Sequence, residues 1–307
     1  MALLTIDFHT HLLEKGVFAA SYWKAVKSNK LNAVAITEHA DESPEKAYRL
    51  LLEKKPKNVL LLPGLELNTS AGHVLAFAKN DDIYRIESLF KKNLPIKNAI
   101  KTAEAEELLL SIAHPWGLSY DSAAYLLGEK KLLALVEKEK IGVEAFNGMF
   151  GNVGSFFYAT NWVKKPINFF DFLEKSRLGK KTRLSKLASK GKQKIDKKGR
   201  ELLERCSKPY QLAAKAKFAT AGSDAHKPSR IGTGITKLQV KDKSLQSVLE
   251  AVENKKNVKW LGPFVRETSK GYAVDKTSIQ KTELLSGLQY AAKRAIMKKV
   301  SRKKANS

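Results

Sequence analysis

The sequence has a single cysteine, Cys206, among its 307 residues. It therefore forms no intramolecular disulfide and no zinc-binding cysteine cluster, and we interpret Cys206 as an ordinary free thiol in reducing surroundings. The sequence also lacks any run of about 18 apolar residues, and its first residues lack the basic stretch, apolar run and small-residue site of a secretory signal. We therefore expect a cytoplasmic protein with no membrane partner.

Acidic residues are scarce in two parts of the chain. The net charge is +25, from 56 Lys and Arg against 31 Asp and Glu. Residues 164–217 contain 18 basic and 5 acidic residues, residues 266–307 contain 11 and 3, and the remainder carries a net charge of only +4. Two basic patches on a nearly balanced body predict an anionic partner, and nucleic acid is the leading candidate.

Short apolar runs alternate with segments of helical periodicity, and hydrophobic residues make up 43% of the sequence, which is typical of a folded globule. The apolar runs predict strands at residues 2–8, 32–38, 58–67, 73–78, 108–114, 141–147, 218–222 and 236–240. Charged segments with helical spacing lie at 17–29, 44–55, 95–109 and 129–140. This alternation predicts an α/β fold with βαβ units and a mainly parallel sheet, open or closed into a barrel.

A basic insertion at residues 149–206 interrupts this alternation. It begins with a stretch rich in glycine and aromatic residues and continues into "RLGKKTRLSKLASKGKQKIDKKGRELLERC". We interpret the second part as mostly helical, with breaks at Gly179, Gly191 and Gly199, because glycine weakens helices. The combination of aromatic residues and cations is typical of single-stranded nucleic acid binding, but a helical lid over the barrel explains it equally well.

The C-terminal segment carries a helical signal of its own. Thr277 and Gln280 form a capping-box pattern, and the residues that follow place an apolar stripe on one helical face. We therefore expect an α/β domain over residues 1–265, interrupted by the insertion at 149–206, and a basic helical extension over residues 266–307.

The chain has only six histidines, and two of them alternate with an aspartate in "TIDFHTH". A strand sends every second side chain to one face, so Asp7, His9 and His11 are expected to point together. Two imidazoles on one face can chelate a metal ion. An aspartate behind them can accept an N–H bond and fix the tautomer of a ligating imidazole.

The other four histidines also lie at the edges of predicted strands, and carboxylates lie near several of them. These positions are His39, His73, His114 and His226, and the carboxylates are Glu66 and Asp224. In parallel α/β architectures the carboxyl ends of the strands converge on one face, where active sites form. Residues more than 200 positions apart in the sequence are therefore expected to meet in one pocket.

Six motifs in this order resemble the PHP (polymerase and histidinol phosphatase) family of metal-dependent phosphoesterases. They are "DFHTH", "AITEHAD", "LLPGLELNTSAGHVLAFA", "LSIAHPWG", "GVEAFNG" and "TAGSDAHKPSRIGTGIT". The resemblance covers roughly residues 1–147 and 206–240. It implies a distorted seven-stranded (β/α) barrel with metal ions at the carboxyl ends of its strands.

The resemblance also implies which residues bind two or three divalent ions, with Mn, Zn and Fe all compatible with imidazole and carboxylate ligands. The first ion would be held by His9, His11, Glu66 and Asp224. The second would share Glu66 and add His73 and His114. The positions that hold a third ion in trinuclear members are occupied here by His39 and His226.

Two positions depart from the family pattern. After His11 many members have Ser-Asp-Gly or a further histidine, whereas this chain has "LLEKG", in which Glu14 is the only candidate ligand nearby. The "TDH" of the family is "TEH" here, so Glu38 replaces an aspartate. We therefore expect two ions and a weaker third.

The implied reaction is hydrolysis of a phosphate ester by a metal-activated hydroxide that attacks phosphorus in line. His39 and His226, where they are not ligands, are candidates to protonate the leaving oxygen, and Asp224 belongs to the same catalytic set. Candidate substrate contacts are Lys227, Arg230, Trp116 and Asn147. For Trp116, stacking on a base and packing at the barrel rim are equally consistent with the sequence.

Nucleotides or nucleic acid ends are the expected substrates, because the basic segment 164–217 and the C-terminal tail are large and localised. One alternative is a small-molecule phosphatase, such as a histidinol-phosphate phosphatase, for which the basic patches are incidental. The other is a nucleic-acid-binding module whose metal site is structural. The complete set of histidines and carboxylates counts against this last alternative.

Overall fold

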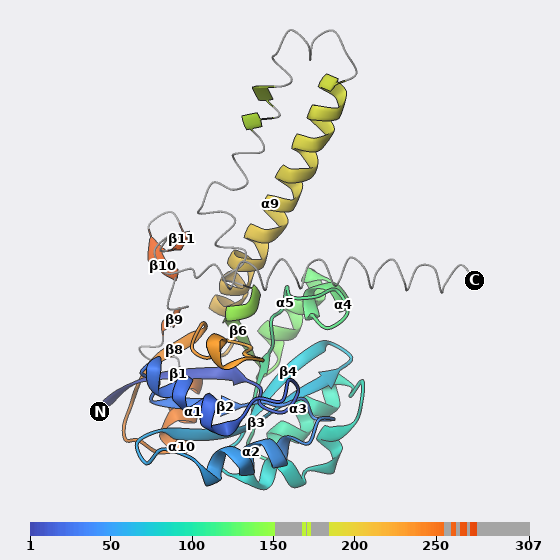
Figure 1. Ribbon diagram of the computed structural model, residues 1–307. Helices are drawn as coiled ribbons and strands as arrows, with labels where there is room; N and C mark the ends of the chain where they lie inside the picture. The colour runs from blue at the N-terminus through green and yellow to red at the C-terminus, as the bar shows by residue number, and fades with distance from the viewer. Residues whose placement is uncertain are drawn as a thin grey trace, which may run out of the picture.

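The computed structural model describes residues 1–150, 168–169, 171–172, 184–254, 259–261, 265–268 and 271–274 (Figure 1). The strands are β1 (Ala2–Thr10), β2 (Ala33–Ile36), β3 (Leu60–Thr69), β4 (Gly72–Phe77), β5 (Leu109–Ile112), β6 (Gly142–Asn147), β7 (Ala219–Gly222), β8 (Ile235–Val240), β9 (Lys259–Leu261), β10 (Val265–Thr268) and β11 (Gly271–Val274). The α-helices are α1 (Ala19–Ser28), α2 (Pro44–Glu53), α3 (Ile96–Ala105), α4 (Ala123–Leu126), α5 (Glu129–Lys138), α9 (Leu184–Lys215) and α10 (Leu245–Glu253). Short 3-10 helices are η1 (Asp81–Arg85), η2 (Glu87–Phe90) and η3 (Pro228–Arg230).

Within these residues nine strands form one sheet in the order β7-β6-β5-β4-β3-β2-β1-β8-β9. Neighbouring strands are parallel except that β4 runs antiparallel to β3 and β5, and β8 antiparallel to β1 and β9. The sheet curls until the end of β7 meets β1, where the N–H of Asp224 donates to the carbonyl of His9 at 2.8 Å. Strands β1–β8 thus make a nearly closed barrel, which confirms the predicted α/β barrel; it has eight strands, one more than the seven that the resemblance implies, and β4 and β8 run antiparallel to their neighbours.

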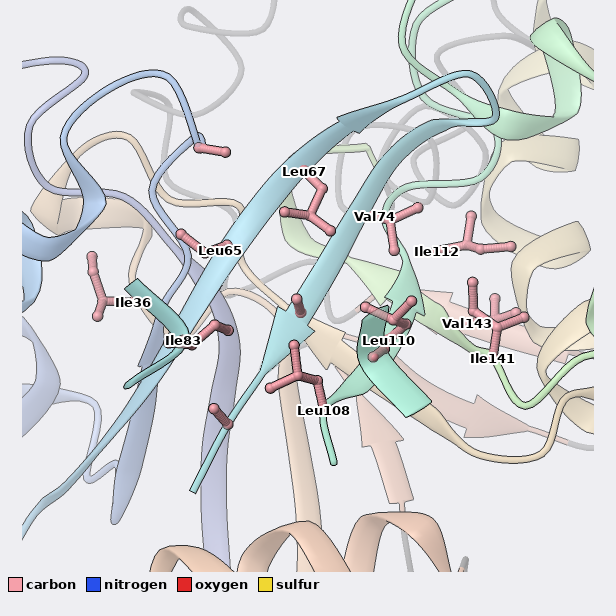
Figure 2. Close-up of a cluster of buried hydrophobic side chains, with 14 of the residues drawn as sticks. Ile36, Leu65, Leu67, Val74, Ile83, Leu108, Leu110, Ile112, Ile141 and Val143 are labelled. Carbon is pink, nitrogen blue, oxygen red and sulfur yellow. The ribbon is translucent and has the colours of Figure 1, made fainter. Parts of the chain in front are cut away.

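Alternation along the strands separates two apolar clusters and sets the orientation of the polar residues between them. Leu65 and Leu67 of β3 pack with Val74 of β4 in one cluster (Figure 2). Phe8 of β1 and Phe77 of β4 meet edge to face in the other, with ring centroids 5.4 Å apart. Successive side chains of a strand point to opposite faces, so a residue between Leu65 and Leu67 faces away from their cluster.

A β-bulge near the end of β1 changes one predicted orientation. Between Asp7 and Thr10, β1 has one residue more than the facing segment of β2, which shifts the alternation beyond it. The Asp7 carboxylate accepts the backbone N–H groups of Ser223 and Gly232, both at 2.8 Å, and that of His9 at 3.2 Å. The prediction that Asp7 fixes a histidine tautomer is therefore wrong; Asp7 ties β1 to the segments around β7 and β8.

Helix α9 covers the second part of the basic insertion and passes through Gly191 and Gly199 without interruption. The breaks predicted at these two glycines are wrong, because a glycine costs a helix only about 1 kcal/mol and the flanking Lys, Gln, Arg and Leu favour helix. Gly179 and the predicted C-terminal helix lie outside the described residues, and the domain division at residue 265 stays a prediction. None of the helices in the described ranges combines the length and the apolar character that a membrane span requires.

Candidate metal centre

The six histidines lie together at one end of the barrel. The parallel strands end at this rim, and the antiparallel β4 begins there, which explains why His73 sits at the start of a strand. Distances between neighbouring ring centroids run from 4.3 Å for His11 and His226 to 5.9 Å for His9 and His114. The rings therefore form one continuous group.

Glu66, the inward residue between Leu65 and Leu67, lies at the centre of this group. Its side chain is 2% exposed. Its Oε2 atom is 3.3 Å from ring nitrogens of three histidines, and its Oε1 atom is 2.8 and 3.1 Å from ring nitrogens of two others. The three imidazoles that face Oε2 are those of His9, His11 and His39, and the two that face Oε1 are those of His73 and His114. One carboxylate thus contacts five of the six imidazoles.

Asp224 approaches the same imidazoles from the end of β7. Its Oδ1 atom is 3.7 Å from Nε2 of His9, 3.6 Å from Nε2 of His11 and 3.4 Å from Nδ1 of His226. Asp224 has φ 54° and His114 has φ 26°. Non-glycine residues in this region of backbone space are strained, and such strain clusters at functional sites.

The chemistry of these donors fits a metal ion. The Nε2 atoms of His9 and His11 are buried, and within the described part of the chain they have no hydrogen-bond partner. Buried polar atoms are normally paired, so these two are unsatisfied unless a cation accepts their lone pairs. Three groups have ligand atoms within 4.8 Å of one another; they are His9, His11 and Glu66, then His39, Glu66 and His73, then His11, Glu14, His39 and His226.

Glu144 and Asn147 of β6 hold the ligand candidates in place. The Glu144 carboxylate is fully buried and accepts Nδ1–H of His9 at 3.0 Å, which directs Nε2 of that ring towards Glu66. It also accepts the backbone N–H of His114 at 2.7 Å. Asn147 donates to Glu144 at 2.9 Å and to Asp224 at 3.2 Å, so its amide is engaged in positioning two carboxylates.

The two positions that depart from the family pattern, Glu38 and the loop that contains Glu14, contact each other in the structure. The Glu38 carboxylate is buried and accepts the backbone N–H groups of Leu12, Leu13 and Glu14 at 2.8, 2.8 and 3.0 Å. This fixes the loop after β1 and turns the Glu14 carboxylate towards His226, with which it forms a close ion pair. The "LLEKG" loop therefore does supply a carboxylate to the cluster, and Glu38 positions it.

Charge coupling keeps the carboxylates of the cluster ionised. Burial acts to raise the pKa of Glu66, but the surrounding imidazoles, His73 first, hold it well below its usual range. At Glu14, burial also acts to raise the pKa of the carboxyl, but the hydrogen bond and the charge of His226 outweigh it and lower this pKa to about 2. Burial lowers the pKa of His39. Metal ligation needs anionic carboxylates and neutral imidazoles, and the carboxylates meet this condition at neutral pH.

The remaining predicted residues lie around the rim. Trp116 is buried, its Nε1–H donates to Glu129 at 3.3 Å, and Lys208 of α9 lies over its ring, 5.9 Å from the centroid. Stacking on a base would require Lys208 to move, whereas packing at the rim needs no change. Lys227 is exposed and Arg230 half-buried, both in the segment that follows Asp224.

Comparison with known proteins gives one match to a family model, described as PHP-associated, over residues 210–257. These residues cover the end of α9, β7, β8 and α10, and they include Asp224 and His226. No curated protein matches the chain.

Two solved structures share the fold. One is a two-domain protein from Bacteroides vulgatus containing a predicted PHP-like metal-dependent phosphoesterase, with 18% identity, a TM-score of 0.52, and a match over 85% of this chain and 65% of that one. The other is Endonuclease Q in complex with a 27-mer duplex substrate that has an abasic lesion at the active site, with 14% identity, a TM-score of 0.50, and 84% and 58% covered. This chain thus spans less than two thirds of either structure. Its barrel and its PHP-associated segment together confirm the resemblance to the PHP family.

Proposed function

We propose that the protein is a metal-dependent phosphoesterase that hydrolyses phosphate esters of nucleotides or nucleic acid ends. The observation that carries this proposal is the convergence of six imidazoles on Glu66 and Asp224, with the Nε2 atoms of His9 and His11 buried and unpaired within the described residues. Both nitrogens face the same Glu66 oxygen at 3.3 Å, an arrangement that suits ligands of one ion. Divalent ions bound there supply the positive charge that activates water and stabilises the charge developing on a phosphate.

The ligand assignment is the one that the family resemblance implies, with Glu14 added, and the three groups of side chains overlap it except that His39 takes the place of His114 beside Glu66 and His73. His9, His11, Glu66 and Asp224 hold one ion, and Glu66 with His73 and His114 holds a second. His39 and His226, together with Glu14, hold a third. When the third site is empty, His39 and His226 stand at the outer edge of the cluster, about one fifth exposed, where either can pass a proton to a leaving oxygen.

Two observations support nucleotides or nucleic acid as the substrate class. Helix α9 places exposed lysines on the side of the barrel where the imidazoles gather. The Endonuclease Q structure, whose fold this chain shares, holds a duplex substrate at its active site. Lys227 and Arg230, three and six residues after Asp224, are the cations that we propose for a bound phosphate.

Metal removal tests the proposal. Phosphate release is measured for the chelator-treated protein and for the same protein reloaded with Mn, Zn or Fe, on nucleoside monophosphates, histidinol phosphate and end-labelled oligonucleotides. We expect release only after reloading, and faster release from nucleotides or oligonucleotides than from histidinol phosphate. The reverse preference would make the protein a small-molecule phosphatase. Bound ions without release from any substrate would leave a nucleic-acid-binding module with a structural metal site.

Replacing Glu14 with glutamine tests the third site. Glutamine keeps the shape of the side chain but removes the charge that pairs with His226, so we expect the variant to bind one divalent ion fewer per chain than the wild type. Metal content per chain is measured by elemental mass spectrometry, with Glu42→Gln, an exposed position close in the sequence, as the matched control. A wild type that binds only two ions, or a variant that keeps three, would remove the third site from the assignment.

A further inference from the structure

Within the described residues, helix α9 is anchored to the barrel near its carboxyl end. Near its carboxyl end, Lys208 and Lys215 pair with Glu129 and Glu137 of α5, and Pro209 lines a small cavity together with His114 and other residues of the rim. The turns before Pro209 continue away from the barrel (Figure 1). We call residues 184–206 of this helix the arm. The arm therefore rises from the rim at which the candidate metal centre lies.

Four lysines of the arm share one face. Lys186, Lys190, Lys194 and Lys197 are spaced by four, four and three residues, which places them in a single stripe along a helix. All four side chains are exposed. Among the described residues none of the four forms an ion pair with an acidic side chain, so within this part of the chain the charge of the stripe is not neutralised.

The opposite face of the arm has an acidic residue and aromatic residues as neighbours. Lys192 projects there and pairs with Asp171, and the neighbouring Phe169 and Phe172 are exposed. Proteins that bind single strands combine cations with aromatic rings on which bases stack. Within the described residues the two exposed rings flank Asp171, which pairs with Lys192, so they are separate from the charge of the stripe, and charge apart from rings suits a sugar–phosphate backbone whose bases are already paired.

We propose that the lysine stripe of the arm binds the phosphate backbone of a duplex nucleic acid whose end lies at the metal centre. This inference rests on the proposed function. A straight row of lysines can engage all its charges at once only on a partner that is itself straight and densely charged. A duplex meets both conditions, with one negative charge per roughly 1.7 Å of axis, whereas a single strand must lose conformational freedom to do so.

The length of the arm sets the length of duplex required. Lys197 precedes Pro209 by 12 residues and Lys186 by 23, which at about 1.5 Å per residue corresponds to roughly 18 and 35 Å along the helix. At about 3.4 Å per base pair these distances equal roughly 5 and 10 base pairs. A mononucleotide at the metal centre therefore reaches none of the four lysines.

Binding of duplexes of increasing length tests the inference. Fluorescence anisotropy is measured with labelled duplexes of about 4, 8, 12 and 20 base pairs and with single strands of the same lengths, and affinity is expected to rise up to roughly 10 base pairs and then level off. The stripe variant replaces all four lysines with glutamine, which keeps helix propensity. It is expected to bind the 12-base-pair duplex about 100-fold more weakly or worse. Its slope of log affinity against log salt concentration is expected to decrease by the amount that three to four phosphate contacts contribute. The matched control replaces four exposed lysines of the barrel, Lys24, Lys27, Lys30 and Lys57.

The outcomes separate this inference from the proposed function. Release of phosphate from a nucleoside monophosphate should be equal in the wild type and the stripe variant, because the stripe lies beyond the reach of that substrate. Equal duplex binding by the stripe variant and the control variant would overturn the inference, as would a length dependence confined to single strands. Stripe-dependent duplex binding by a protein that releases no phosphate would keep the inference and overturn the phosphoesterase.

Discussion

Replacing Glu66 with glutamine is expected to lower metal-dependent phosphate release by about 10³-fold or more, equivalent to roughly 4 kcal/mol of transition-state stabilisation. The Glu66 carboxylate contacts five imidazoles, three through Oε2 and two through Oε1. Glutamine has nearly the same shape but no charge, and one of its two ends is an NH₂ group that cannot bind a cation. Of the two proposed ions that share Glu66, one therefore loses a ligand and the other keeps only a neutral amide oxygen.

The measurement combines phosphate release with metal content per chain. The matched control is Glu104→Gln, at an exposed position of α3 where the same chemical change touches nothing in the cluster. Circular dichroism and thermal melting establish that both variants are folded. A Glu66→Gln protein that keeps its ions and its activity would show that the imidazoles bind metal without this carboxylate.

Replacing Gly222 with alanine is expected to destabilise the fold by about 3 kcal/mol or more and to lower metal content at the same time. A Cβ atom at this position would lie 2.5 Å from the backbone nitrogen of His9 and closer still to the His9 Cβ. Neither atom can yield easily, because both belong to β1 within the closed barrel. The added methyl group must push β7 away from β1 and move His9 with respect to Asp224.

Denaturant unfolding of Gly222→Ala and of a neighbouring variant, Ser223→Ala, isolates the effect of crowding. The Ser223 hydroxyl donates to the carbonyl of His9 at 3.2 Å, so its removal deletes one hydrogen bond at the same junction without adding volume. That loss should cost about 1 kcal/mol. Equal stability of the two variants would mean that the strands can separate here at little cost.

The parts of the site that sequence alone predicts depend on local rules. The strands and the four longer helices of residues 1–147 were predicted to within a few residues, because apolar period and charged helical faces are properties of short segments, whereas the short η1, η2 and α4 were not predicted. The gathering of the histidines follows from a second rule, that carboxyl ends of parallel strands share one rim. His73 lies at the same rim because β4 runs antiparallel, so that the beginning of this strand, rather than its end, is located there.

The remaining features depend on contacts between distant segments. The Asp7 carboxylate is bound by backbone groups of Ser223 and Gly232, more than 200 residues away, and a bulge that no residue pattern announces sets its direction. The position of Glu144 in the strand that ends at Asn147 predicts a supporting or pocket-wall role for it rather than direct ligation, but the groups that it binds, His9 and the backbone of His114, come from other strands. The role of Glu38 depends on the shape of the loop that it binds, which the letters "TEH" and "LLEKG" do not convey.

The first proposed metal site spans the junction of β1 and β7, two strands that are synthesised at very different times. His9 and His11 belong to the first strand of the barrel, whereas Asp224 follows β7, which comes after the whole basic insertion. A growing polypeptide can therefore present most of the imidazoles long before it can complete the first proposed site, which needs Asp224, or the third, which needs His226. Ions bound across that junction would act as a clasp between the first and last parts of the barrel, since metal affinity and folding are coupled. Occupancy of the sites that span this junction would then report the fraction of molecules whose β1 and β7 have come together.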